Sequence, residues 1–280
     1  GKMMRPMLTL LMAKLCGGIV DSTYYAAISL ELLHTASLVH DDVVDESDKR
    51  RGQSSVNAIY DNKVSVLVGD FLLATSLTNA ALTDNISLVK LVSCLGQKLS
   101  EGEIIQLSNT NASDFSEDVY FDVIKKKTAA LFSTAAEAGV RSVESCDETA
   151  EKAYRFGELI GIAFQIKDDI FDYNPSDSLG KPSGNDMKEG KITLPLIEVL
   201  EKCSEAERLQ ILERLSACGE DEQAVDFLQG VVESTGGLAM ARRTMQKYID
   251  RAVSILSEFE DSPYRSSLIN LCAFVAQRDK

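Results

Sequence analysis

Residues 161–173 read GIAFQIKDDIFDY, in which polar and acidic residues interrupt an apolar helical pattern. Four of the polar residues fall at the spacing i, i+3, i+4, i+7, which places them on one face of an α-helix. They are Gln165, Asp168, Asp169 and Asp172. A stripe that faces a core would be apolar, so this pattern predicts a long helix over residues 148–173 with a functional polar face.

A second acidic cluster, DDVVD, occupies positions 41–45 of the segment ELLHTASLVHDDVVDESDKRRG (31–52). Its helix is expected to open at Asp21-Ser22 and to end near residues 48–53. Carboxylates four residues apart on a helix repel each other, and both clusters approach a helix C-terminus, where the macrodipole disfavours anions. Magnesium removes this penalty, because it binds oxygen ligands and bridges carboxylates to phosphates. Solvated acidic surfaces are the alternative interpretation.

The rest of the chain has apolar residues at three- and four-residue spacing and almost no strand-like alternation, which predicts an all-α fold. Beyond the two acidic helices, further helices are expected at 54–82, 86–108, 116–139, 192–202, 205–217, 221–235, 237–258 and 264–278. Residues 174–191 are rich in glycine, proline and serine and predict a long loop. With no internal repeat, we expect a single domain over 1–280.

The composition excludes several classes of protein. The net charge is −14 and the pI is about 4.7, which argues against nucleic-acid binding. Six scattered cysteines and two histidines suggest neither a zinc site nor a disulfide framework, and they fit the cytoplasm. The sequence has no run of about 18 uncharged apolar residues, so no transmembrane segment is expected.

An anionic ligand would then need local basic residues, since the chain as a whole is acidic. Arginine suits a diphosphate because its planar fork donates two hydrogen bonds. Basic candidates lie at the chain start, just after the first cluster, in the helix of residues 116–139 and around the long loop. These are Lys2, Arg5, Arg50, Arg51, Lys127, Lys181 and Lys191. His34 precedes Asp41 by seven residues, two helical turns, and is expected to share its face.

These segments, taken in order, resemble the polyprenyl synthetase family, the trans-isoprenyl diphosphate synthases. The resemblance extends over essentially the whole chain and is carried by GKMMRP, ELLHTASLVHDDVVDESDKRRG, SVLVGDFLLA, EGEIIQL, KKKTAALF, GIAFQIKDDIFDY, LGKPSGNDMKEGKITLP and AFVAQRDK. It implies an isoprenoid-synthase-type bundle of long helices around a central active-site cavity, usually in a homodimer. The family normally has one or more helices before GKxxRP, so we expect an N-terminal portion to be missing here.

The resemblance also implies roles for individual residues. Three magnesium ions would bind with the substrate, with Asp41, Asp45 and Asp168 as principal ligands and Asp42, Asp169 and Asp172 in support. Isopentenyl diphosphate would bind Lys2, Arg5, His34 and Arg51. The allylic diphosphate, such as farnesyl diphosphate, would bind Arg50, Lys127, Thr128, Gln165, Lys181 and Lys191. Lys127 is also expected to act in catalysis.

The implied reaction is ionisation of the allylic diphosphate, condensation with isopentenyl diphosphate and loss of a proton. Ala36 and Ser37 lie about one turn before Asp41, and both are small, which in this family predicts a medium or long product of about C30–C50. The resemblance is greatest to the long-chain, octaprenyl-type synthases, so an octaprenyl-like product is favoured. Phe132 could form a lower floor or could simply belong to the core. The protein would contact membranes only transiently, for product release.

Four alternatives stay open: a synthase of shorter geranylgeranyl or farnesyl chains, a regulatory subunit of a heteromeric synthase, a terpene cyclase and an acidic scaffold. The two complete DDxxD clusters disfavour the regulatory subunit, and the extra basic segments disfavour the cyclase.

Overall fold

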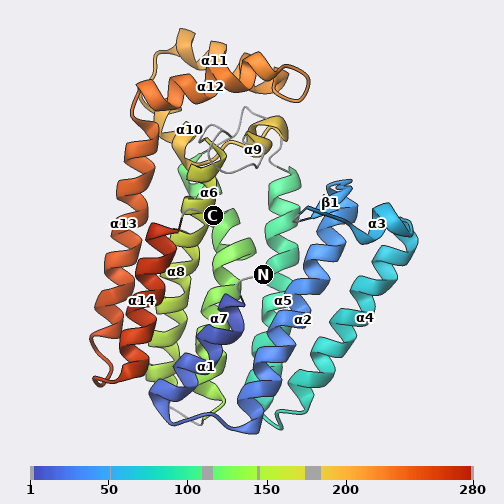
Figure 1. Ribbon diagram of the computed structural model, residues 1–280, viewed down its shortest axis with the longest axis vertical. Helices are drawn as coiled ribbons and strands as arrows, with labels where there is room; N and C mark the ends of the chain where they lie inside the picture. Colours follow the sequence, from blue (N-terminus) through green and yellow to red (C-terminus); the bar gives the residue numbers. More distant parts are fainter. Residues whose placement is uncertain (1–2, 51, 109–115, 144–145, 174–183, 279–280) are drawn as a thin grey trace. The chain divides into compact units, whose positions relative to one another are not determined.

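The computed structural model describes residues 3–50, 52–108, 116–143, 146–173 and 184–278. These residues are mostly helical, which confirms the all-α prediction (Figure 1). Contacts divide the chain into two compact units. Unit 1 comprises residues 1–99, 130–157 and 255–268, and unit 2 comprises 100–129, 158–254 and 269–280. The expected single domain over 1–280 stays a prediction.

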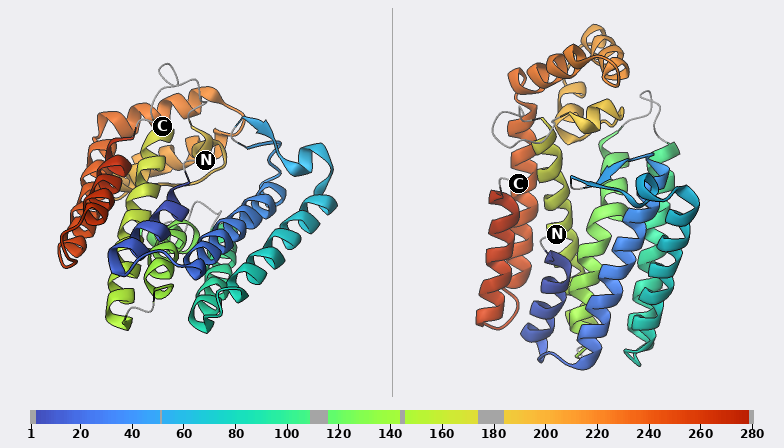
Figure 2. Two further views of the ribbon diagram at one scale, coloured as in Figure 1. Left: turned by 60° about the horizontal axis from the view of Figure 1, so that its bottom comes forward. Right: turned by 45° about the vertical axis from the view of Figure 1, so that its right-hand side comes forward.

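Unit 1 is organised around helix α2 (Asp21–Val44), which carries the first acidic cluster at its C-terminal end. It packs against α1 (Met4–Cys16), α4 (Asn62–Ala81) and α7 (Ala130–Arg141), as the neighbouring ribbons in Figures 1 and 2 show. Buried hydroxyl groups join these helices. Ser29 Oγ donates to the Ser76 carbonyl over 2.8 Å, and Thr9 Oγ1 donates to the Ala135 carbonyl over 3.0 Å. Such satisfied polar contacts fix the register of the helices.

The segment after α2 differs from the expected helices. Helix α2 ends at Val44, and a short hairpin follows, in which β1 (Lys49–Arg50) pairs with β2 (Gln53–Ser54). Gly52 has φ of +78°, which favours a residue without a Cβ. The helix expected at 54–82 is divided into α3 (Val56–Ile59) and α4, because Asp61 leaves the helical region and caps Val64 N over 2.8 Å.

The predicted bounds of the other helices agree more closely with the structure. Helix α5 (Ile86–Ser108) and helix α11 (Glu205–Ala217) have the expected bounds. Residues 116–139 form α6 (Glu117–Ile124), a π-helical turn η1 (Lys125–Ala129) and α7. The helix of the opening segment is α8 (Asp147–Asp172). The remaining helices are α9 (Asn185–Lys188), α10 (Leu194–Leu200), α12 (Glu222–Ser234), α13 (Gly237–Leu256) and α14 (Pro263–Gln277).

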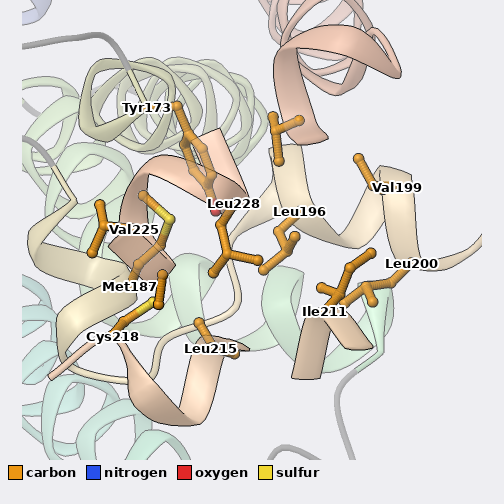
Figure 3. Close-up of a cluster of buried hydrophobic side chains, with 12 residues drawn as sticks. Tyr173, Met187, Leu196, Val199, Leu200, Ile211, Leu215, Cys218, Val225 and Leu228 are labelled. Carbon is orange, nitrogen blue, oxygen red and sulfur yellow. The ribbon is translucent and has the colours of Figure 1, made fainter. Parts of the chain in front are cut away.

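In the core of unit 2, helices α9, α10 and α12 pack around Tyr173, the residue that follows the second acidic cluster. Tyr173 is 2% exposed and joins a buried apolar group that includes Met187 of α9, Leu196 of α10 and Leu228 of α12 (Figure 3). Thr193 Oγ1 donates to Tyr173 Oη over 3.3 Å. The burial of Tyr173 therefore anchors the C-terminal end of α8, where Asp172 lies.

Close packing of α1 on α7 gives a test of unit 1. A Cβ added at Gly139 would lie 2.3 Å from the Thr9 carbonyl oxygen and 3.0 Å from Met12 Cβ, so Gly139→Ala must push the helices apart. We expect a loss of about 1–3 kcal/mol in the free energy of unfolding, measured by urea denaturation. Gly230 of α12 has nothing within 4 Å of an added Cβ, and G230A is the matched control. That control should gain about 0.5–1 kcal/mol. An unchanged G139A would contradict the packing described.

Candidate functional site

The three carboxylates of the second cluster have different environments on α8. The side chain of Asp168 is 43% exposed, whereas Asp169 is only 2% exposed. Asp172 is half-buried at the end of the helix. Asp168 is therefore the carboxylate of this cluster most accessible to a cation from solvent.

Asp169 is held by a line of hydrogen bonds from three other side chains. Tyr120 Oη of α6 donates to Asp169 Oδ2 over 2.5 Å, and Gln165 Nε2 donates to Oδ1 over 2.8 Å. The other end of the Gln165 amide accepts from Thr128 Oγ1 over 2.7 Å. Each amide atom has a chemically suitable partner, so this line fixes Gln165 and both oxygens of Asp169.

Asp172 accepts hydrogen bonds from main-chain N–H groups of α9, which follows residues 174–183 in the sequence. Its Oδ1 accepts from Asn185 N over 2.9 Å and its Oδ2 from Asp186 N over 3.0 Å. The Asp172 carbonyl accepts from Gly184 N over 2.9 Å. These bonds satisfy the first N–H groups of α9 and bring a fourth carboxylate, that of Asp186, toward the cluster.

The crowding of these buried carboxylates changes their protonation. Burial, and next the neighbouring Asp186 charge, raise the pKa of Asp169 to about 8. Burial followed by the Asp172 charge raises the pKa of Asp186, while Lys191 opposes that shift. Burial also raises the pKa of Asp172, against its three main-chain hydrogen bonds. A cation close to these groups would favour their ionised forms and so oppose these upward shifts in pKa.

Lys127 lies in the π-helical turn η1, next to the C-terminal part of α5. Its Nζ forms an ion pair with Glu103 and donates to Gln106 Oε1 over 3.1 Å. A Cβ at Gly102 would lie 2.9 Å from Lys126 Cβ and Lys127 Cγ, so the glycine in the EGE sequence permits this approach. π-Helical turns are frequent at functional sites.

In unit 1, the first cluster has one buried carboxylate and two more accessible ones. Asp42 is 4% exposed, and its Oδ1 accepts from Arg50 Nε of the hairpin over 2.7 Å. Asp41 is half-buried in α2, and Asp45 is exposed at its C-cap. The hairpin thus places Arg50 beside the cluster, as an arginine that binds the same ligand would require.

Other predicted residues of unit 1 lie along α1, α2 and α7. His34 and Ala36 are buried in α2, and Ser37 Oγ donates to the His34 carbonyl over 2.9 Å. The Arg5 guanidinium lies 5.4 Å from the centroid of the Phe132 ring, which is 1% exposed. In unit 2, Lys191 pairs with Glu189. Lys2, Arg51 and Lys181 lie outside the described residues.

Divalent metal chemistry fits the two clusters only with ligands from outside the protein. Among the described ranges, no group of three or more His, Cys, Asp or Glu side chains converges to enclose an ion. Magnesium commonly keeps several waters and shares its coordination between one or two carboxylates and substrate phosphates. Accessible carboxylates such as Asp45 and Asp168 are suited to that arrangement.

Comparison with known proteins gives the family. Residues 1–232 match the polyprenyl synthetase family. The chain belongs to the polyprenyl synthetase family. It is 39% identical over 281 residues, 99% of the chain and 85% of the relative, to the all-trans-nonaprenyl-diphosphate synthase (geranyl-diphosphate specific) of Rhodobacter capsulatus.

Two solved structures are also similar to this chain in sequence and fold. A geranylgeranyl pyrophosphate synthase from Bacteroides thetaiotaomicron is 49% identical, has a TM-score of 0.87 and covers 99% of this chain and 87% of its own. A polyprenyl synthase from Caulobacter crescentus, crystallised with calcium and isoprenyl diphosphate, is 33% identical. It has a TM-score of 0.93 and covers 100% of this chain and 86% of its own.

The structure also brings to the site residues that the sequence did not single out. Tyr120 and Asp186 join the second cluster, Glu103 pairs with Lys127, and Arg278 pairs with Asp168 over 2.8 Å. Glu103 lies in the quoted EGEIIQL segment, and Asp186 and Arg278 also lie in quoted segments. No helical spacing connects any of them to the clusters, because each contact joins separate elements.

The raised pKa of Asp169 predicts how stability depends on pH without metal. The unfolded carboxyl loses its proton near pH 4, whereas the folded one keeps it up to about pH 8, so stability falls as the pH rises through this range. We expect the thermal midpoint in EDTA to fall from pH 5 to pH 8, and to fall less in Asp169→Asn, which cannot ionise. Equal slopes for the two proteins would contradict this assignment.

Proposed function

We propose that this chain is a divalent-metal-dependent trans-prenyltransferase that extends an allylic diphosphate with isopentenyl diphosphate to an all-trans polyprenyl diphosphate of about C30–C50. The observation that carries the proposal is the second cluster. It keeps Asp168 accessible while hydrogen bonds fix Asp169 and Asp172, and Lys127 and Thr128 are held on adjoining elements of the same unit. Membership of the polyprenyl synthetase family supports this reaction class.

Magnesium, as three ions with the substrate bound, would supply positive charge that stabilises the departing diphosphate. Asp41, Asp45 and Asp168 would hold the ions, and Asp42, Asp169 and Asp172 would support them. The Caulobacter relative was crystallised with calcium and isoprenyl diphosphate, which supports a divalent ion with a diphosphate here.

The basic residues would bind and orient the two substrates. Lys127, Thr128, Gln165, Lys181, Lys191 and Arg50 would hold the allylic diphosphate, with Lys127 offsetting the charge that develops on the leaving group. Lys2, Arg5, His34 and Arg51 would hold isopentenyl diphosphate. The proton lost after condensation would go to the released diphosphate, since none of these side chains is an obvious strong base.

Product length is the part of the proposal on which the relatives differ. The Rhodobacter relative is named for a nonaprenyl product and the Bacteroides relative for a geranylgeranyl product. Ala36 is 2% exposed and Ser37 is half-buried, and both are small side chains one turn before Asp41. We favour the longer product because a short-chain enzyme would need bulk near these positions.

Helix α4 supports a homodimer. By length and composition it could cross a membrane, with a mean hydropathy of 1.4, yet it contains Asp70 and packs on α2. Its apolar side chains are exposed in a single chain, with Leu67 at 67% and Phe71 at 70%. We propose that a second copy covers this surface, and that membrane contact is transient, for product release. All six cysteines are free, which suits the cytoplasm.

The assignment of the metal ligands is tested by removing one carboxylate from each cluster. We expect Asp41→Ala and Asp168→Ala each to lower the rate of incorporation of labelled isopentenyl diphosphate at least about 100-fold, because the charge of the leaving group loses its stabilisation. The helical circular dichroism should be unchanged. Asp226→Ala, at an exposed position of α12, is the matched control. Near-normal turnover in either cluster variant would contradict the proposal.

Product length is tested separately by placing bulky side chains on α2 one turn before Asp41. Ala36→Phe and Ser37→Phe should shift the products toward shorter chains, measured by chromatography after the diphosphate is removed. Thr35→Phe, at an exposed position of the same turn, should leave the distribution unchanged. Unaltered products in both buried-side variants would remove the argument from these two residues.

A further inference from the structure

The side chain of Arg278, close to the C-terminal end of the chain, is buried against the helix that carries the second cluster. Only 4% of the side chain is exposed, which is unusual for an arginine. A buried guanidinium is costly unless it is paired and hydrogen-bonded. The pKa of Arg278 is lowered, chiefly by burial, against the opposing attraction of Asp168. Such a cost is tolerated where the contacts fix a particular geometry.

Three different kinds of contact hold the Arg278 guanidinium. Its Nη2 donates to Asp168 Oδ1 over 2.8 Å and to the Phe164 carbonyl over 2.7 Å. The guanidinium carbon lies 3.7 Å from the centroid of the Phe164 ring and 5.6 Å from that of Phe171. Residues 164, 168 and 171 follow the i, i+4, i+7 spacing, so Arg278 covers one continuous face of α8.

The position of Asp168 gives this contact a consequence for the proposed site. Asp168 is the carboxylate of the second cluster that remains 43% exposed, while its Oδ1 is in contact with Arg278. The contact restricts the rotation of the carboxylate and leaves part of it accessible. It also supplies a positive charge to a region that holds three further acidic groups, Asp169, Asp172 and Asp186.

We propose that Arg278 is a positioning residue for Asp168, orienting the carboxylate and attracting the anionic complex of a divalent ion with diphosphate. The inference rests on the proposed function, because it assigns Asp168 to that complex. A purely structural role for the Arg278 side chain would be to anchor the residue that follows α14 to α8, through its hydrogen bond to the Phe164 carbonyl. The two roles predict different effects of the same substitution.

Helix α14 offers a matched control. Near its other end, Arg265 donates to the Phe259 carbonyl over 2.8 Å and to Asp261 over 2.7 Å, the same types of partner that Arg278 has. No residue of either aspartate cluster is among these partners. Arg265→Met therefore removes a carbonyl partner and a carboxylate partner from the same helix, at a more exposed position, without touching Asp168.

The experiment measures binding of Mn²⁺ with inorganic pyrophosphate to the chain of residues 1–280 by electron paramagnetic resonance, with thermal unfolding in parallel. Arg278→Met should weaken binding about tenfold, as loss of groups that orient a metal ligand commonly does. Arg278→Lys keeps the charge but lacks the planar fork, and it should bind between the wild type and R278M. R265M should bind within about twofold of the wild type. If R278M does not fold, R278K and Arg278→Gln are compared instead.

The inference would be overturned if R278M folded and bound like the wild type but unfolded at a lower temperature. Arg278 would then be a structural anchor only. If R278M does not fold, the same result with R278Q would have the same meaning. Asp168→Ala separates this result from failure of the proposed function. Wild-type binding by D168A would show that the ion does not use Asp168, so both proposals would fall. Loss of binding in D168A together with normal binding in R278M and R278Q would overturn the role of Arg278 alone.

Discussion

The repulsion between carboxylates gathered on one face of a helix is the constraint on which the second cluster depends. Asp168, Asp169 and Asp172 lie within five residues near the C-terminal end of α8, where the macrodipole also disfavours negative charge. The fold offsets this cost in part, with Arg278 at Asp168, Tyr120 at Asp169 and main-chain N–H groups at Asp172. It does not remove the cost, since the pKa values of Asp169, Asp172 and the neighbouring Asp186 all stay raised. A divalent cation that binds together with the diphosphate substrate would offset the remaining repulsion between the carboxylates.

These supports come from elements that are far apart in the chain but belong to one compact unit. Tyr120 is on α6, Arg278 follows α14, and the N–H groups that bind Asp172 open α9. Each support is itself fixed by packing or burial, as Met187 of α9 shows by its place in the apolar core. Orientation of the carboxylates is thus a property of the folded unit and not of the acidic sequence alone. Groups that orient metal ligands in this way commonly affect binding as strongly as some ligands do.

The helices and both clusters could be predicted from the sequence because helical periodicity and local charge are short-range signals. The exact bounds of α5 and α11 follow from that pattern. The division of 54–82 could not be predicted, because it depends on one residue, Asp61, leaving the helical region. The roles of Tyr120 and Arg278 could not be predicted either, since their partners are 49 and 110 positions away, where spacing has no meaning. Asp42 and Arg50 were both expected at the site, but the ion pair that joins α2 to the hairpin became visible only in the structure.

The most direct measurement incubates the wild-type protein with isopentenyl diphosphate and farnesyl diphosphate, with magnesium and with EDTA, and sizes the dephosphorylated products. We expect all-trans alcohols of about C30–C50 that form only with magnesium. Products that stop at C20 would favour the shorter-chain alternative, to which the name of the Bacteroides relative points. No product longer than the primer, or equal product in EDTA, would contradict the central claim that the aspartate clusters act through a divalent ion bound with diphosphate.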